Sequence, residues 1–398
     1  MNKPLRLAMV SAILAAFSMS SHAADGPTFT VSGFGTAALT ATDTDDAEFA
    51  RYNQASGVRK SPRPGVDSNF GIQGTAKIND ALSFTVQGLA RKNARDSWGA
   101  ELSWAFAKYK INDDFSVRVG RIGMPIYMIS DFRQVGYANT MIRPPAEVYR
   151  QVTGDSYDGV DAIYQHSFGD TTLTAQVGIG NMNARVPDDN RIKYKPATSI
   201  NIVAENGPFT VRFGRVDAKV TFEGSELLDG LFATLRRVNM PQVINDLSVT
   251  EVDGSFTSLG FTMDYKNFLV QSEYAVRRTD TRVIQDTTSY YTMLGYRYGK
   301  ITPYYYYGNI KQDNDRTYKG LPTTGPLAAL TAGVNGLMKA GLQSTNAVGV
   351  RWDFHKSAAL KVQVDHVKPR DGAGAFLKAK PGFNDAVNVY AAGIDFVF

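Results

Sequence analysis

Residues 69–91 read NFGIQGTAKINDALSFTVQGLAR, and their alternation of apolar and polar residues indicates the fold. From Phe70 to Ile78, apolar or small residues occupy every second position, while polar residues dominate the positions between them. Residues 79–81 form a short turn, and the same alternation resumes in residues 82–91. A period of two on both sides of a tight turn predicts a β-hairpin with one apolar face and one wet face.

The same alternation continues along most of the chain and predicts about sixteen strands. Tight turns alternate with long connections near residues 41–67, 123–156, 222–254 and 311–343. These unequal ends favour an all-β fold, a transmembrane antiparallel β-barrel with short periplasmic turns and long outer loops. A soluble β-sandwich is the competing fold, but it rarely has such unequal ends. The predicted strands lie near residues 28–40, 68–78, 82–92, 98–111, 115–122, 157–167, 171–180, 197–205, 209–221, 255–265, 268–278, 287–298, 301–310, 344–354, 359–368 and 387–398.

The start of the chain predicts a secretory signal peptide. Lys3 and Arg6 precede an apolar stretch at residues 7–19, and small residues surround Ala23, the expected cleavage position. The apolar stretch is too short to cross a bilayer as an ordinary helix. We therefore expect a signal peptide at residues 1–23 and a single barrel domain at residues 24–398.

The composition excludes several kinds of site. Cysteine is absent, which rules out disulfides, thiolate catalysis and Cys-ligated metals. The formal charge of +5 falls to +3 when Lys3 and Arg6 leave with the signal peptide, and this excess is too small to indicate a nucleic-acid partner. No HExxH, GxSxG or phosphate-loop motif occurs, so the sequence predicts no catalytic residue, cofactor or metal.

The last strand ends on an aromatic residue. Tyr390, Ala392, Ile394, Phe396 and Phe398 share one parity and are expected to face lipid. This ending resembles the C-terminal recognition signal of Gram-negative outer-membrane proteins, which implies the barrel-assembly machinery as a partner. The residues that the resemblance assigns to membrane insertion are Tyr390, Ile394, Phe396 and Phe398.

The mature chain resembles the Gram-negative porin superfamily. The resemblance is carried by residues 69–74, by residues 117–121 (VRVGR) before a long loop, and by Phe398. It implies a sixteen-stranded homotrimer in the outer membrane, in contact with lipid and lipopolysaccharide, whose third outer loop folds into the lumen. Residues 123–156 match that loop in order and length. Residues 144–149 read PPAEVY where general porins have a PEFGG-type segment, which favours a divergent or substrate-selective subfamily.

Parity separates the charged side chains of the strands into lumen and lipid sets. Arg121 and Arg215 each follow a lumen-parity arginine by three residues, so either a glycine bulge redirects them inward or they lie at the aqueous mouth. Acidic lumen candidates accompany the basic series: Asp161, Glu205, Asp264, Glu273, Asp353 and Asp365. The basic residues expected to face the lumen are Arg91, Arg118, Arg212, Arg277, Arg297 and Arg351.

The third loop combines charges of both signs, at Asp131, Arg133, Arg143, Glu147 and Arg150. Facing the arginines of the wall, these residues are expected to form a transverse field that orders polar solutes and resists apolar ones. Ordinary loop ion pairs are the alternative role for the same residues.

These features predict an outer-membrane porin through which small hydrophilic solutes or ions diffuse passively, with a weak preference for anions. One alternative is a channel selective for small organic anions. Another is a barrel with an occluded lumen and a structural, adhesion or enzymatic role. Leucines at helical spacing in residues 224–243 predict a short helix that caps the mouth, plugs the lumen or contacts another subunit.

Overall fold

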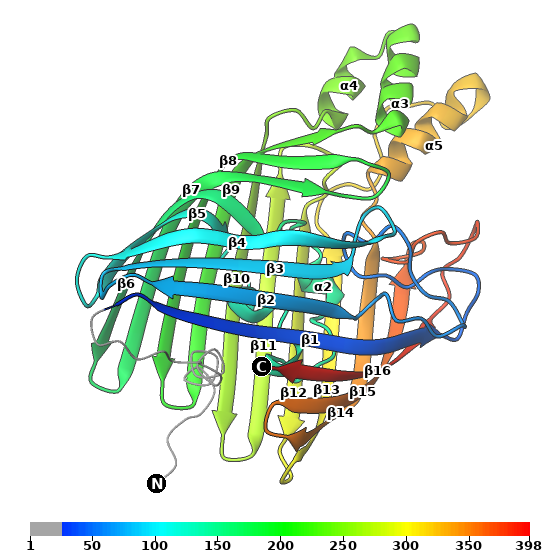
Figure 1. Ribbon diagram of the computed structural model, residues 1–398. Helices are drawn as coiled ribbons and strands as arrows, with labels where there is room; N and C mark the ends of the chain where they lie inside the picture. Colours follow the sequence, from blue (N-terminus) through cyan, green and yellow to red (C-terminus); the bar gives the residue numbers. More distant parts are fainter. Residues whose placement is uncertain (1–25) are drawn as a thin grey trace.

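Sixteen strands form one closed antiparallel barrel in the computed structural model, which describes residues 26–398 (Figure 1). Each strand pairs with its neighbours in the chain, and β1 pairs with β16 to close the sheet. Every strand that the alternation predicts is present. The strands are β1 (Thr28–Thr42), β2 (Asn69–Lys77), β3 (Leu82–Lys92), β4 (Trp98–Lys110), β5 (Phe115–Gly123), β6 (Ser156–Phe168), β7 (Thr171–Arg185), β8 (Arg191–Asn206), β9 (Phe209–Glu223), β10 (Val252–Tyr265), β11 (Phe268–Thr279), β12 (Thr287–Tyr296), β13 (Ile301–Gln312), β14 (Leu342–His355), β15 (Ala358–Arg370) and β16 (Val387–Val397).

The hairpin of β7 and β8 extends further toward the loops than predicted. The predicted strands are too short because the alternation of apolar and polar residues is interrupted in this hairpin. The register shifts between Gly180 and Met182 and again between Tyr194 and Ala197. Each irregularity resets which residues face inward, so a strict period-two pattern ends there although pairing continues. The predicted signal peptide lies outside the described residues. Within residues 26–398, no helix is both long and apolar enough to cross a membrane.

The two ends of the chain close the barrel. Phe398 and Gly33 exchange backbone hydrogen bonds, with N···O distances of 2.8 and 2.9 Å. The Phe398 ring lies over Gly33 and the Phe396 ring over Gly35, at positions where a Cβ atom would overlap the ring. Phe398 also stacks on Phe70 of β2 at 6.2 Å. The C-terminal aromatic residues therefore cover the seam between the first and last strands.

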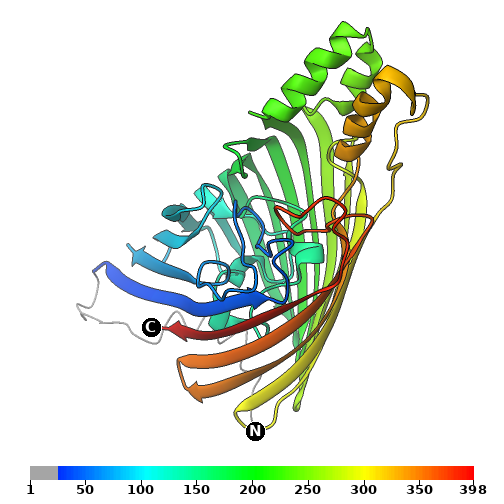
Figure 2. The ribbon, with the colours of Figure 1, turned by 90° about the vertical axis from the view of Figure 1, so that its right-hand side faces the viewer.

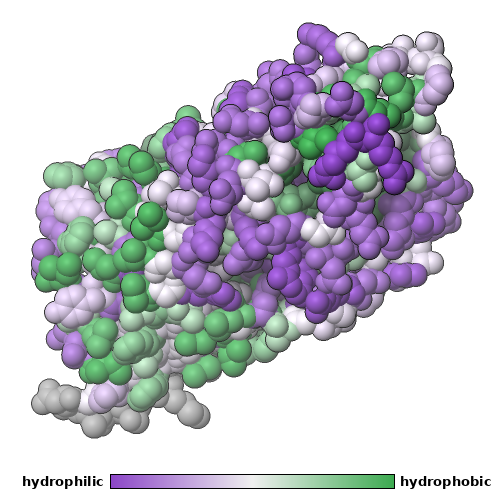
Figure 3. All heavy atoms as spheres, turned by 90° about the horizontal axis from the view of Figure 1, so that it is seen from above, coloured by the Kyte–Doolittle hydropathy of each residue, from purple (hydrophilic) through white to green (hydrophobic). Residues whose placement is uncertain are grey.

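The outer wall carries an apolar band with a sharp upper boundary. On β9, outward Val211 is followed on the same face by the charged residues Arg215 and Asp217, and on β5 outward Val119 is followed by Arg121. Figure 3 shows hydrophobic residues gathered toward the end of the barrel away from the loops and mostly hydrophilic residues over the middle of the face in view. This pattern matches a lipid-facing band below a wet rim.

A long loop fills much of the lumen, as predicted. Loop L3 (residues 124–155) enters the barrel after β5 and contains three short helices, η1 (Ser130–Phe132), η2 (Gly136–Ala138) and α2 (Ala146–Tyr149). Its buried residues, among them Ile126 and Tyr149, pack against inward side chains of β9 to β14 such as Tyr291. The main hydrophobic core therefore lies inside the barrel, between L3 and one side of the wall.

Three further helices stand beyond the strand ends at the loop end of the barrel (Figure 2). They are α3 (Glu226–Arg237) and α4 (Pro241–Leu247) from one loop and α5 (Ala328–Leu337) from another. Leu235, Leu247 and Val334 pack these helices against one another. The predicted helix in residues 224–243 exists, but its possible role as an inward plug is wrong, because its apolar face is covered by α4 and α5 outside the lumen.

Adding a side chain at the seam should destabilise the barrel. Gly33→Val would force the Phe398 ring away from β1, and we expect a loss of about 1–3 kcal/mol in the free energy of unfolding. Urea unfolding in lipid vesicles measures this loss. Gly74→Val is the matched control, since Gly74 also faces outward on a neighbouring strand but has open space around its Cβ position. Equal stability of the two variants would contradict a role for the ring in closure.

Candidate functional site

Buried charges on the inner wall hold the middle of L3. Lys361 on β15 is almost completely buried, forms an ion pair with Asp395 of β16 at 2.7 Å, and donates to the carbonyl groups of Gly136 and Met141 at 2.8 and 3.1 Å. Asp395 also accepts a hydrogen bond from Thr36 of β1 at 2.6 Å. A backbone turn inside a barrel must satisfy its carbonyl groups, and Lys361 supplies the donors here.

Two arginines fasten the same part of L3. Arg351 of β14, which faces inward as predicted, donates to the carbonyl groups of Tyr137 and Asn139 at 2.7 and 2.8 Å. Arg143 of L3 lies buried between Asp67 and Asp365, with N···O distances of 2.6 and 3.0 Å. These arginines therefore act as anchors, and their guanidinium groups are not free to line an aqueous path.

The next turn of L3 is anchored to β14 and β11. Glu147 is fully buried and accepts hydrogen bonds from Gln343 at 2.7 Å and Thr345 at 2.5 Å. Burial raises the pKa of Glu147 above its usual value, although both hydrogen bonds favour the ionised form. Arg277 faces inward as predicted, but it donates to the carbonyl groups of Gln151 and Gln285. The predicted transverse field does not include Glu147 or Arg277.

Two other predicted arginines do meet acids near the lumen. Arg212 of β9 pairs with Asp131 of L3 at 3.1 Å, and Asp131 itself is largely exposed. Arg118 of β5 pairs with Asp161 of β6 through two hydrogen bonds of 3.0 and 2.5 Å. The Arg212 pair is the arrangement that was predicted, an acid on the loop facing an arginine on the wall.

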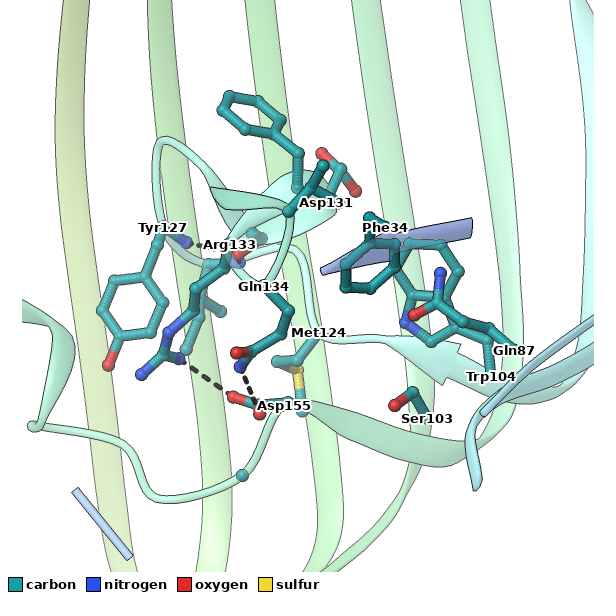
Figure 4. A pocket seen from close by; sticks show the side chains of 15 residues that line it. Phe34, Gln87, Ser103, Trp104, Met124, Tyr127, Asp131, Arg133, Gln134 and Asp155 are labelled. Atoms are coloured by element: carbon teal, nitrogen blue, oxygen red, sulfur yellow. Dashed lines mark hydrogen bonds and ion pairs between the residues drawn. The ribbon is translucent and has the colours of Figure 1, made fainter. Parts of the chain in front are cut away.

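A dense network surrounds the carboxylate of Asp155, at the end of L3 (Figure 4). Asp155 accepts hydrogen bonds from Tyr52, Arg91, Arg133 and Gln134 at 2.9–3.1 Å. Arg133 also lies over the Tyr52 ring at 4.1 Å, a cation–π contact. Enclosure alone would raise the pKa of Asp155, but the guanidinium groups of Arg133 and Arg91 outweigh it and hold the pKa below its usual value.

Tyr52 connects this network to the first outer loop. Loop L1 (residues 43–68) folds back over the lumen, where Phe49 and Val58 join an apolar cluster with Phe376 of the last outer loop and Val389 of β16. L1 therefore covers the side of the lumen near the seam. Tyr52 extends from L1 to the wall residue Arg91 and to L3.

Two cavities meet at this network. The larger one, which we call the vestibule, has a volume of about 350 Å³ and lies among L1, β3, β4 and the loop ends of β6 and β7. The smaller one, about 40 Å³, lies between L3 and β1, β3 and β4. They share four lining residues, which we call the neck: Ser103, Gln134, Gly154 and Asp155.

The neck lies where L3 comes close to β4. Figure 4 shows Ser103 and Trp104 across from Gln134 and Asp155. On the other side of L3, the inward residues of β12 to β15, such as Tyr291, Ala347 and Gln363, are buried by the loop. The space that remains beside L3 is therefore displaced toward β1 to β5.

Three of the predicted pore-lining arginines need correction. No register shift occurs at residues 118–121 or 212–215, so the proposed glycine bulge is wrong at both places. Arg215 faces outward and pairs with Asp217 on the same face. Arg121 has outward parity but borders the vestibule where β4 separates from β5, and pairs with Asp158 at 2.7 Å. Arg297 lies in the turn after β12, paired with Asp264, instead of within a strand.

The residues of the C-terminal strand face the predicted way. Tyr390, Ile394 and Phe398 are exposed on the outer surface, and Phe396 is partly covered where its ring lies over Gly35. Their role in insertion stays a prediction. Several acids of L1 lie in ion pairs, such as Asp46 with Lys380 and Glu48 with Lys378. Residues 26–398 contain no group of three or more His, Cys, Asp or Glu side chains arranged to hold a metal.

Sequence reasoning missed Lys361, Tyr52 and Asp155. The alternation did contain a signal for Lys361, because it shares the inward parity of Asp365 on the same strand. No local pattern identifies Tyr52 or Asp155, which are distant in sequence and meet only when L1 and L3 fold into the lumen.

Removing the Lys361 ammonium should release L3. Lys361→Met leaves Asp395 buried without its cation, and we expect the free energy of unfolding to fall by about 3–5 kcal/mol. Urea unfolding measures the loss, and single-channel recording should show noisier current. The double variant Lys361→Met/Asp395→Leu removes both charges and should recover most of the stability. A double variant as unstable as the single one would contradict the unpaired-charge explanation.

Comparisons with known proteins agree with this architecture. No curated protein matches the chain by sequence. Similar solved structures include an anion-selective porin from Comamonas acidovorans (13% identity, TM-score 0.59, 94% of this chain and 100% of that one). They also include Salmonella typhi OmpF in complex with daunomycin (13%, 0.58, 95% and 99%) and the trimer form of OmpT from Vibrio cholerae (15%, 0.56, 94% and 100%). The family model described as Gram-negative porin matches residues 10–372. The chain belongs to the Gram-negative porin family and is a β-barrel of the outer membrane.

Proposed function

We propose that this porin is a passive channel for small hydrophilic solutes and ions, that it has no enzymatic role, and that it prefers anions weakly. The observation that carries the proposal is that the polar vestibule meets a smaller, more apolar cavity at the neck. Solutes enter the vestibule from outside, pass between β4 and L3, and continue below L3. Because the neck is formed by one strand and a firmly anchored loop, it sets the largest solute that can cross.

The anion preference rests on the vestibule. Its basic lining residues are Arg51, Arg91, Lys92, Arg95, Arg121 and Arg185, against Glu101, Asp155 and Asp158, a formal excess of three positive charges. A confined aqueous path attracts ions of the opposite sign, and salt screens the effect beyond about 8–10 Å. The preference is therefore modest and falls as ionic strength rises.

Similar solved structures support two parts of the proposal, the homotrimer and the anion preference, and the outer surface supports a third, the contact with lipid. One similar structure is described as a trimer form, which supports a homotrimer for this chain. Another is described as an anion-selective porin, in line with the excess of basic residues in the vestibule. The exposed aromatic and aliphatic residues of the outer wall suit contact with outer-membrane lipid and lipopolysaccharide.

The purified protein should give discrete current steps in planar bilayers. Ser103→Trp places an indole in the neck and should lower the single-channel conductance by roughly twofold or more. Val86→Trp is the matched control, because Val86 is exposed on the outer wall and lines neither cavity. Wild-type protein without current steps would reject the channel, and unchanged conductance of Ser103→Trp would reject the neck as its narrowest point.

Reversing charge in the vestibule should change ion selectivity. Arg95→Glu/Arg185→Glu turns the excess of three positive charges into one negative charge, and the chloride-to-potassium permeability ratio should fall by about twofold. Reversal potentials in a potassium chloride gradient measure this ratio. Arg236→Glu/Arg237→Glu makes the same change on exposed α3 outside the vestibule and should leave the ratio near the wild-type value. A cation preference in the wild type would reject the proposed anion selectivity.

A further inference from the structure

One basic residue of the vestibule lacks the acid partner that the others have. Lys92 pairs with Asp96 at 2.6 Å, and Arg91 pairs with both Glu101 and Asp155. The remaining arginines of the lining, Arg95, Arg121 and Arg185, also have carboxylate partners. Among residues 26–398, the guanidinium of Arg51 has neither a carboxylate within ion-pair distance nor a hydrogen-bond partner.

The groups around Arg51 do not neutralise it. Asp67 is the acid whose charge acts most strongly on Arg51, but its Oδ2 already binds Arg143 at 2.6 Å and Thr40 at 2.7 Å. Its Oδ1 has no hydrogen-bond partner and forms no ion pair with Arg51. The other charged neighbours, Arg91 and Arg133, are themselves cations. Arginine stays protonated at neutral pH, so Arg51 adds a charge that the protein leaves uncompensated beside the vestibule.

Leaving such a charge unpaired costs folding free energy unless a ligand or water forms hydrogen bonds with it. A guanidinium presents a planar fork of N–H donors that matches the two oxygens of a carboxylate. The rest of the lining offers donors and acceptors that suit hydroxyl groups, among them Ser68, Asn93, Asn181 and Asn183. A volume of about 350 Å³ is near the lower end of pockets that hold small molecules.

We propose that Arg51 and the vestibule around it form a binding site for small hydroxylated monocarboxylates, which bind there before crossing the neck. One unpaired positive charge matches one carboxylate, and the amide and hydroxyl side chains bind the solute's hydroxyl groups. The inference rests on the proposed channel function and names a substrate class for it. Loop L1, which carries Arg51, therefore contributes to the substrate selectivity of the channel.

The test is current block by D-gluconate added on the loop side of reconstituted wild-type channels. Gluconate should interrupt the chloride and potassium current, and Arg51→Gln should raise the half-blocking concentration about tenfold, the loss expected for one charge-assisted pair. Arg51→Lys keeps the charge without the fork and should give an intermediate value. Arg63→Gln is the matched control, since Arg63 is an exposed arginine of the same loop that does not line the vestibule.

Two comparison solutes test whether block requires both the carboxylate and the hydroxyl groups of gluconate. Sorbitol, a neutral six-carbon polyol, should not block, and inorganic phosphate should block less than gluconate. The proposal is overturned if wild-type channels conduct but gluconate does not block them, if phosphate blocks more strongly, or if Arg51→Gln and wild type are blocked alike. A variant that is blocked like wild type yet unfolds more easily would assign Arg51 to balancing Asp67. Absence of any conductance would instead reject the channel function.

Discussion

A backbone amide in the hydrocarbon of a membrane has no water with which to form a hydrogen bond. The closed architecture of this protein follows from that constraint. Each unpaired group costs several kcal/mol, so a membrane-crossing sheet must close upon itself. The pairing of β1 with β16 meets this requirement. It also explains why small residues and large rings alternate at the seam, since Gly33 leaves the space in which Phe398 covers the joint.

Closure creates an interior that must also be filled or hydrated. L3 fills one side of it, and the inward charges of the wall satisfy the loop's backbone and side chains. Lys361, Arg351 and Arg277 donate to L3 carbonyl groups, and Glu273 accepts from the amide of Met128 at 3.2 Å and the hydroxyl of Tyr149 at 2.7 Å. Read along one strand, these inward charged residues resemble the lining of a water-filled pore. In the folded protein they form a polar core around L3.

This packing decides where open space remains in the lumen. Because L3 is bound to β9 through β15, the remaining space lies beside β1 to β5, and the carboxylate of Asp155 lies at the neck. The same carboxylate holds L1, through Tyr52, and the wall, through Arg91. The Asp155 carboxylate therefore links the positions of L1 and L3 to Arg91 of the wall. The shape of the neck depends on this whole hydrogen-bond network.

The strands, their faces and the closed barrel follow from the amino-acid pattern, because alternation with a period of two is a local property that each hairpin repeats. The same pattern also set the inward direction of Arg118, Arg212 and Arg351, and the outward direction of Tyr390 and Ile394. The tertiary structure alone decided which inward charges remain near water and which are buried. That distinction depends on where L1 and L3 lie, and a loop's path follows from contacts between residues far apart in the chain. For this reason Arg143 and Glu147 became anchors, while Arg51, Tyr52 and Asp155 came to surround the vestibule and its neck.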